Sequence, residues 1–157
     1  MTPEPTIDPD LPQAAGVYQL TFDDGQRYTL SIPEGYDGGE GVPLVLALHY
    51  GGTVSPWYGR GVLEGLVEPA LRELQPIIVA PDAQQGTWAS EAAEEDVLAL
   101  LDHITANYNT DREKALITGF SMGGMGTWYL AARNQERFAA AIPIAARPQS
   151  NTLTTEW

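Results

Sequence analysis

The chain has 157 residues, a formal net charge of −13, no cysteine, and histidine only at His49 and His103. Its length suits one domain, and its negative charge argues against nucleic acid or an anionic lipid surface as a partner, because either would be repelled. The absence of cysteine excludes disulfides and a thiolate nucleophile, and two separated histidines make a poor zinc site.

The two ends of the sequence differ from its middle. Residues 1–15 combine prolines with acidic residues and predict a tail, because proline fixes φ and donates no backbone hydrogen bond. Residues 147–157 are polar and without pattern, which leaves 16–146 as the folded core. No basic and apolar leader follows Met1, and no apolar run approaches the roughly 20 residues of a membrane helix. We expect a soluble chain without a membrane partner, either cytoplasmic or a mature secreted form.

The first elements are predicted to be strands. Apolar and polar residues alternate in 16–22 and 27–33 around Asp24-Gly25, which indicates an antiparallel hairpin. The apolar run at 43–48 is short enough for a strand buried on both faces.

The segment His49-Tyr50-Gly51-Gly52 follows that strand, at the end where open α/β sheets bind ligands. By itself it fits a loop that donates a backbone N–H to an oxyanion and a plain glycine-rich turn equally well. The serine motif described below favours the oxyanion loop. We expect His49 to be structural and to brace this loop through hydrogen bonds to the backbone.

Residues 63–74 show helical spacing, and Pro69 within them predicts a kink or a second helix. A buried strand is expected at 76–80, followed by a loop to residue 90. Trp88 in that loop lies where it could line an acyl or alcohol pocket, or pack over the loop. Ser90 is a candidate N-cap for a helix with an apolar stripe. His103 falls on the flank of that stripe, which favours a solvated or half-covered ring.

The strongest chemical signal is Gly119-Phe120-Ser121-Met122-Gly123, between an apolar strand at 115–119 and a helix. This is the context that the G-x-S-x-G nucleophile elbow requires. The sharp turn exposes Ser121 to a base, and the glycines avoid a Cβ that would collide with neighbouring backbone. The helix start directs the N–H of Met122 at the reaction site. A glycine-rich turn without chemistry is the alternative.

The helix after the elbow is expected to turn Met125, Trp128 and Ala132 inward, and Gly124 and Gly126 suggest that it approaches the sheet closely. The last strand is predicted at 138–145. If the fold stops there, this strand is an apolar edge that must be covered. We therefore expect a homodimer, or a second chain joined through 138–145.

The order of these elements and motifs resembles the α/β-hydrolase superfamily over about residues 16–146. Leu48-His49-Tyr50-Gly51-Gly52, Val79-Ala80-Pro81-Asp82, the Ser121 motif and Phe138-Ala139-Ala140-Ala141 are most similar to its esterase, polyester-depolymerase and feruloyl esterase-like group. That group includes predicted serine peptidases with the same core.

The resemblance implies a fold and a reaction. The fold is a mostly parallel sheet with an N-terminal antiparallel hairpin and helices on both faces, truncated after the strand that follows the nucleophile helix. The reaction is hydrolysis of small carboxylic esters through an acyl-serine, without metal or organic cofactor. Ser121 is then the nucleophile, the N–H groups of Met122 and Gly51 are the oxyanion donors, and Tyr50 and Trp88 lie near the substrate.

The sequence also departs from the family pattern, in which an acid and then a histidine follow the nucleophile in chain order. No histidine follows Ser121, and Glu156 is an acid without an imidazole. Three interpretations stay open. The missing acid and histidine lie on another polypeptide or in a cleaved segment; His103 or His49, from this chain or a symmetry mate, is the base; or the chain is an inactive binding or structural module.

Overall fold

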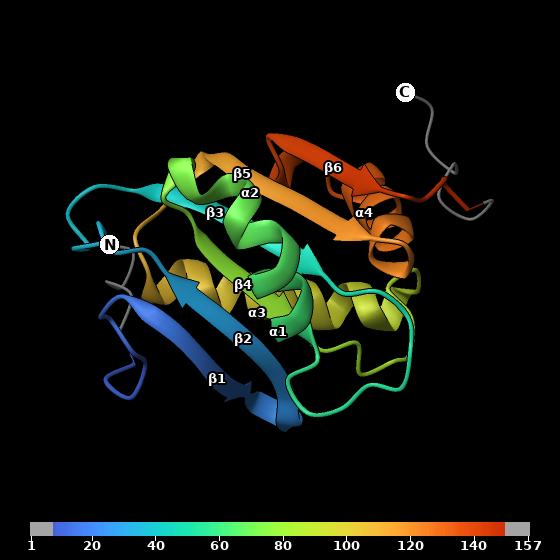
Figure 1. Ribbon diagram of the computed structural model, residues 1–157, viewed down its shortest axis with the longest axis horizontal. Coiled ribbons are helices and arrows are strands. Elements are labelled where there is room, and N and C mark those ends of the chain that lie inside the picture. Colours follow the sequence, from blue (N-terminus) through green and yellow to red (C-terminus); the bar gives the residue numbers. More distant parts are fainter. Residues whose placement is uncertain (1–7, 150–157) are drawn as a thin grey trace, which may run out of the picture.

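The computed structural model describes residues 8–149, whose strands form a single six-stranded sheet in the order β1-β2-β4-β3-β5-β6 (Figure 1). The strands are β1 Gly16–Phe22, β2 Gln26–Ile32, β3 Val42–Leu48, β4 Ile77–Pro81, β5 Thr110–Phe120 and β6 Ala140–Ile144. β1 and β2 form the predicted antiparallel hairpin, and β2 is antiparallel to β4. The pairs of β3 with β4, β3 with β5 and β5 with β6 are parallel.

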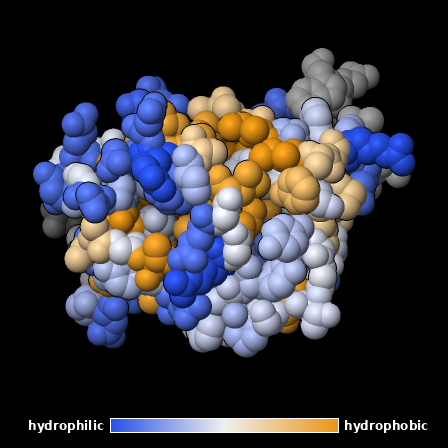
Figure 2. All heavy atoms as spheres, viewed as in Figure 1, coloured by the Kyte–Doolittle hydropathy of each residue, from blue (hydrophilic) through white to orange (hydrophobic). Residues whose placement is uncertain are grey.

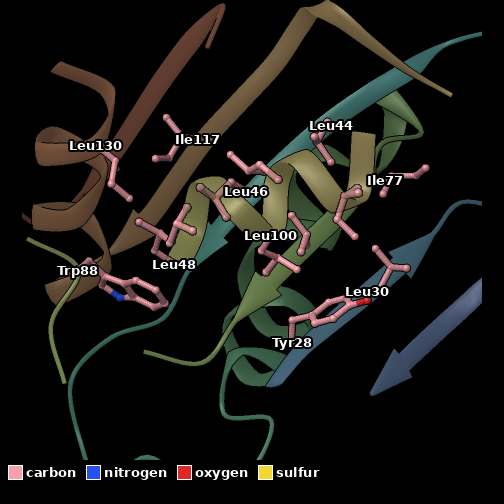
Figure 3. Packing of buried hydrophobic residues seen from close by; sticks show 14 of the residues in the cluster. Tyr28, Leu30, Leu44, Leu46, Leu48, Ile77, Trp88, Leu100, Ile117 and Leu130 are labelled. Carbon is pink, nitrogen blue, oxygen red and sulfur yellow. The ribbon is translucent and has the colours of Figure 1, made fainter. Parts of the chain in front are cut away.

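Helices cover both faces of the sheet, because alternate residues of the central strands are apolar on either side. α3 (Glu91–Asn107) and α4 (Met122–Arg133) pack on one face, where Leu46 contributes to the larger core cluster. Figure 3 shows Leu100 of α3 and Leu130 of α4 in that cluster. Val45 faces the opposite layer, which is formed by the helical segment between β3 and β4.

That helical segment runs through four short parts: α1 Gly59–Val62, a π-helical turn Leu63–Val67, α2 Glu68–Leu71 and a 3₁₀ turn Arg72–Leu74. Pro69 lies in the first turn of α2, where its missing N–H costs nothing. The prediction of a second helix opening at this proline is confirmed, and the π-helical turn just before it was not anticipated.

The sequence also predicted the N-cap of α3 and the inward face of α4. The Ser90 hydroxyl accepts a hydrogen bond from the Ala93 N–H at 3.2 Å and caps α3 as predicted. The inward face predicted for α4 is only partly right, because Met125 and Trp128 are half-buried. The buried residues of α4 include Tyr129 and Leu130 as well as Ala132 and three glycines, and the small residues among them allow the helix to lie against the sheet.

β6 is shorter than the predicted strand 138–145 and is an edge strand within the described part of the chain. Its first three residues are exposed, with Ile142 at 41%. Part of the predicted N-terminal tail lies against the surface, since Pro12 accepts a hydrogen bond from the Tyr108 hydroxyl at 2.7 Å. Residues 1–7 and 150–157, with Glu156, lie outside the described residues. Between residues 8 and 149 no helix has both the length and the apolar character to cross a membrane.

Candidate active site

Ser121 occupies the turn between β5 and α4 with a φ of 55° and a ψ of −111°. A positive φ at a residue with a Cβ is strained, and such strain persists only where neighbouring structure imposes it. Here the Ser121 N–H donates to the Ile144 carbonyl at 3.0 Å, and the Ser121 carbonyl accepts from the Met125 N–H at 2.9 Å. The last residue of β6 and the first turn of α4 therefore fix the serine.

The predicted role of the two flanking glycines agrees with the packing. A Cβ on Gly119 would collide with the Gly123 carbonyl, and a Cβ on Gly123 would collide with the Leu48 carbonyl at the end of β3. Because both obstacles are backbone atoms, neither can move aside cheaply. The glycines thus let α4 begin directly over the ends of β3 and β5.

The loop after β3 lies beside the start of α4. A Cβ built on Gly51 would be 3.9 Å from both Cβ and Sδ of Met122. Neither the Gly51 N–H nor the Met122 N–H has a hydrogen-bond partner among residues 8–149. Both predicted oxyanion donors are thus unpaired within residues 8–149, and their role in stabilising an oxyanion stays a prediction.

His49 is fully buried, and the structure uses both of its ring nitrogens. Nδ1 lies 2.7 Å from the Tyr50 carbonyl, and Nε2 accepts from the Ala83 N–H at 3.0 Å. This pattern fixes the neutral tautomer with the proton on Nδ1. Burial lowers the pKa of His49, while the Tyr50 carbonyl and the charge of Asp82 oppose the shift. The ring braces the loop, as the sequence predicted, and has no free nitrogen to deprotonate Ser121.

His103 lies far from Ser121. Its half-buried ring lies on Phe22 of β1, with ring centroids 4.5 Å apart. β1 and β5 are separated by β2, β4 and β3, which at about 4.8 Å per strand is roughly 19 Å. An imidazole side chain cannot span that distance, so His103 of this chain cannot be the base for its own Ser121.

The residues proposed for substrate contact have different surroundings. Trp88 is 2% exposed, and its indole N–H donates to the His49 carbonyl at 3.0 Å. Of the two roles expected for Trp88, core packing is the one that its burial fits. Tyr50 is 39% exposed and meets Phe120 edge to face at 6.3 Å between centroids. Phe120 precedes Ser121, so the exposed aromatic surface near the serine comes from Tyr50 and Phe120.

Sequence analysis missed the positioning role of Asp82. Its carboxylate is buried and accepts from the N–H groups of Trp57 at 2.7 Å and Gly59 at 3.0 Å. It thereby fixes the start of α1, where Tyr58 contacts His49 edge to face at 4.8 Å. The sequence feature that could have indicated this role is an acidic residue directly after a predicted buried strand. Among the described residues no group of three or more histidine or acidic side chains is placed to hold a metal ion.

Several known proteins are similar to this chain in sequence. The prolyl oligopeptidase family matches residues 83–157. A probable feruloyl esterase C of Aspergillus terreus is 32% identical over 133 residues, which cover 77% of this chain and 46% of that protein. The feruloyl esterase C of Emericella nidulans is 29% identical over 142 residues, which cover 83% of this chain and 48% of that protein.

Solved structures show the same fold. A thermostable esterase superposes with a TM-score of 0.71 at 23% identity, covering 88% of this chain and 42% of that one. The predicted α/β-hydrolase fold is therefore confirmed. This chain spans about half the length of the feruloyl esterases that it matches.

Proposed function

From the esterase-like α/β-hydrolase fold that this chain has, we propose that it hydrolyses carboxylic esters through an acyl intermediate on Ser121. One observation above all supports this proposal. The strained Ser121 lies at the start of α4, beside the free N–H groups of Met122 and Gly51.

In the proposed reaction the Ser121 hydroxyl attacks the ester carbonyl, and the N–H groups of Met122 and Gly51 stabilise the resulting oxyanion. Collapse of the tetrahedral intermediate expels the alcohol and leaves the acyl group on Ser121. Water then releases the acid and restores the serine. Tyr50 and Phe120 offer an apolar surface for the acyl or alcohol part of a small ester.

Both steps need a general base, because a serine hydroxyl is a weak nucleophile at neutral pH. The geometry argues against His49 and His103 of the same chain. We propose that the base and its acid come from hydrolase polypeptide outside residues 8–149, since the relatives are about twice as long as this chain. Catalysis by this chain alone then rests on the oxyanion donors and on substrate binding. In serine hydrolases that have lost a member of the triad, these two contributions still accelerate the reaction roughly 10³- to 10⁴-fold over water.

The experiment is hydrolysis of p-nitrophenyl acetate by the parent chain beside Ser121→Ala, His49→Gln and His103→Ala. We expect slow release of p-nitrophenol that Ser121→Ala abolishes and His103→Ala leaves unchanged. A peptide p-nitroanilide tests the peptidase alternative raised by the prolyl oligopeptidase match, and we expect no cleavage. Loss of activity in His103→Ala would instead identify this residue as the base, contributed by a second copy.

Neither histidine of this chain lies where it could deprotonate Ser121. This also favours a second candidate function, that of a non-catalytic hydrolase-fold module that binds without turnover. The two candidates differ in one result. The parent chain and Ser121→Ala are compared twice, first alone and then after addition of the half of a feruloyl esterase relative that this chain does not match. If the parent chain releases p-nitrophenol no faster than Ser121→Ala in either case, the chain is better described as a non-catalytic module.

A further inference from the structure

A groove of about 610 Å³ lies between the β1–β2 hairpin and the helical segment from α1 to α2. That segment packs on β3 and β4 through Val62, Leu63 and Val67 (Figure 1). It leaves the hairpin beside it half-covered, because every second residue of β1 is exposed, beginning with Val17 at 41%. The volume of the groove is within the range of small-molecule sites.

The floor of the groove is formed by three neighbouring strands. Val17 of β1, Ser31 of β2 and Ile78 of β4 are paired in register and therefore point to the same side of the sheet. Leu63 of the helical segment lines the groove beside them. Figure 2 views the molecule from this side and shows hydrophobic residues at the surface between the hydrophilic residues of the helical segment and the hairpin. This floor suits the apolar part of a ligand.

Ser31 is the unusual residue of the floor. It is 7% exposed, and its hydroxyl has no hydrogen-bond partner among residues 8–149. A buried hydroxyl is ordinarily hydrogen-bonded, because leaving it unpaired costs free energy. Since the Ser31 side chain faces the groove, a polar group of a ligand bound there completes its hydrogen bonding.

Carboxylates dominate the charged rim of the groove. Glu34, Glu64 and Glu68 line it, against one guanidinium, that of Arg72. Arg72 donates to Glu68 at 2.8 and 2.9 Å, and Arg60 lies 3.0 Å from Glu64. Glu34 has no ion-pair partner within the described part of the chain. The net negative charge of the rim favours a cation over an anion.

The helical wall of the groove has an irregular backbone. Leu63 and Glu64 belong to the π-helical turn Leu63–Val67. Such turns are rare and are often found at functional sites. The irregular turn is a third observation that points to a ligand, besides the unpaired Ser31 hydroxyl and the carboxylate rim.

We propose that this groove binds a small organic cation, an amine with an apolar body. The ammonium group donates to the Ser31 hydroxyl and to the rim carboxylates, and the apolar body lies on Val17, Leu63 and Ile78. The groove is separate from Ser121, because Ile78 is the second residue of β4 whereas Ser121 follows the last residue of β5, at the opposite end of these parallel strands. The ligand is therefore distinct from the ester substrate.

The test compares three probes with the same apolar body: phenylbutylamine, phenylbutanol and phenylbutanoate. Each is titrated into the full chain, and NMR follows the methyl groups of Val17 and Leu63. We expect the amine to shift these methyl signals, the alcohol to bind about tenfold more weakly and the carboxylate not to bind.

Two variants test the residues that select the amine. Ser31→Ala removes the free hydroxyl, and Glu34→Gln removes one rim charge with little change of shape. Glu95→Gln is the matched control, since Glu95 is exposed on α3, on the other face of the sheet. We expect Ser31→Ala and Glu34→Gln each to weaken binding of the amine at least about fivefold and Glu95→Gln to leave it unchanged.

Absence of amine binding, equal binding of the amine and the alcohol, or full binding by Ser31→Ala would overturn this inference. So would an equal loss in Glu34→Gln and Glu95→Gln, because the amine would then respond only to the overall charge of −13. The binding is independent of ester hydrolysis, and we expect Ser121→Ala to bind the amine as the parent chain does. Failure of the proposed function therefore leaves this result unaffected.

Discussion

Individual residues around Ser121 are fixed by backbone atoms rather than by side-chain packing. The positive φ of Ser121 costs on the order of 1–3 kcal/mol, and the hydrogen bonds of its N–H and C=O hold it in place. The glycine spacing predicted this turn because only a residue without Cβ fits at 119 and 123. Sequence analysis could not predict the burial of Trp88, since an aromatic residue in a loop packs inward or lines a pocket with the same local pattern.

The first residue-scale prediction concerns Gly123. In Gly123→Ala the new Cβ meets the Leu48 carbonyl, which is part of the central strand β3. We expect the free energy of unfolding to fall by about 3 kcal/mol, the upper part of the range for overpacking. Urea denaturation measures this change. Gly65→Ala is the control, because nothing lies within 4 Å of a Cβ there; an equal loss in both variants would contradict the account.

The second residue-scale prediction concerns pH. The folded state lowers the pKa of His49 below its ordinary value near 6.5, so the unfolded chain binds more protons as the pH falls. The stability that His49 contributes is therefore present above pH 6.5 and is lost on acidification through that value. We expect the stability difference between the parent and His49→Gln to shift against the parent from pH 7.5 to 5.5, by at most about 1.4 kcal/mol per pH unit. Thermal unfolding of both proteins across that range measures it, and parallel pH profiles would show that folding does not lower the pKa of His49.

Among the elements, α3 was the easiest to predict and α4 the hardest. A cap at Ser90 and an apolar stripe define α3 locally. The inward face of α4 depends on how closely the sheet allows the helix to approach, and a Cβ on Gly126 would collide with Trp88 from another segment. α3 and α4 are also joined by Glu94, which accepts hydrogen bonds from Arg133 at 2.7 Å and from Asn134 at 2.8 Å. Such contacts between segments leave no trace in local periodicity.

The prediction for α3 concerns its N-cap. Ser90→Ala removes the acceptor of the Ala93 N–H, and we expect a loss of about 1 kcal/mol in the free energy of unfolding. Ser55→Ala changes an exposed serine in the loop before α1 and should stay within about 0.5 kcal/mol of the parent. Chemical denaturation of the two variants decides the matter, and a Ser90→Ala protein as stable as Ser55→Ala would exclude a contribution from the cap.

At the scale of the whole molecule, the predicted hairpin, parallel strands and helices on both faces form one sheet with the α/β-hydrolase fold. The strand order and the half-covered face beside α1 and α2 arise from long-range pairing, which the sequence pattern does not encode locally. The edge at β6 was expected from the apolar run at 138–145. Its connection with Phe120 and Ser121 emerged only from the register of β5 and β6.

The central claim is that Ser121 is the residue acylated, with the oxyanion stabilised by the N–H groups of Met122 and Gly51. Site-resolved acylation tests it most directly. The parent chain is treated with p-nitrophenyl acetate, digested and mapped by mass spectrometry, with Ser121→Ala as control. The account predicts that the acetyl group is found on half-buried Ser121 and is absent from exposed Ser55. Acetylation of the serines in proportion to their exposure, or an unmodified Ser121, would contradict it.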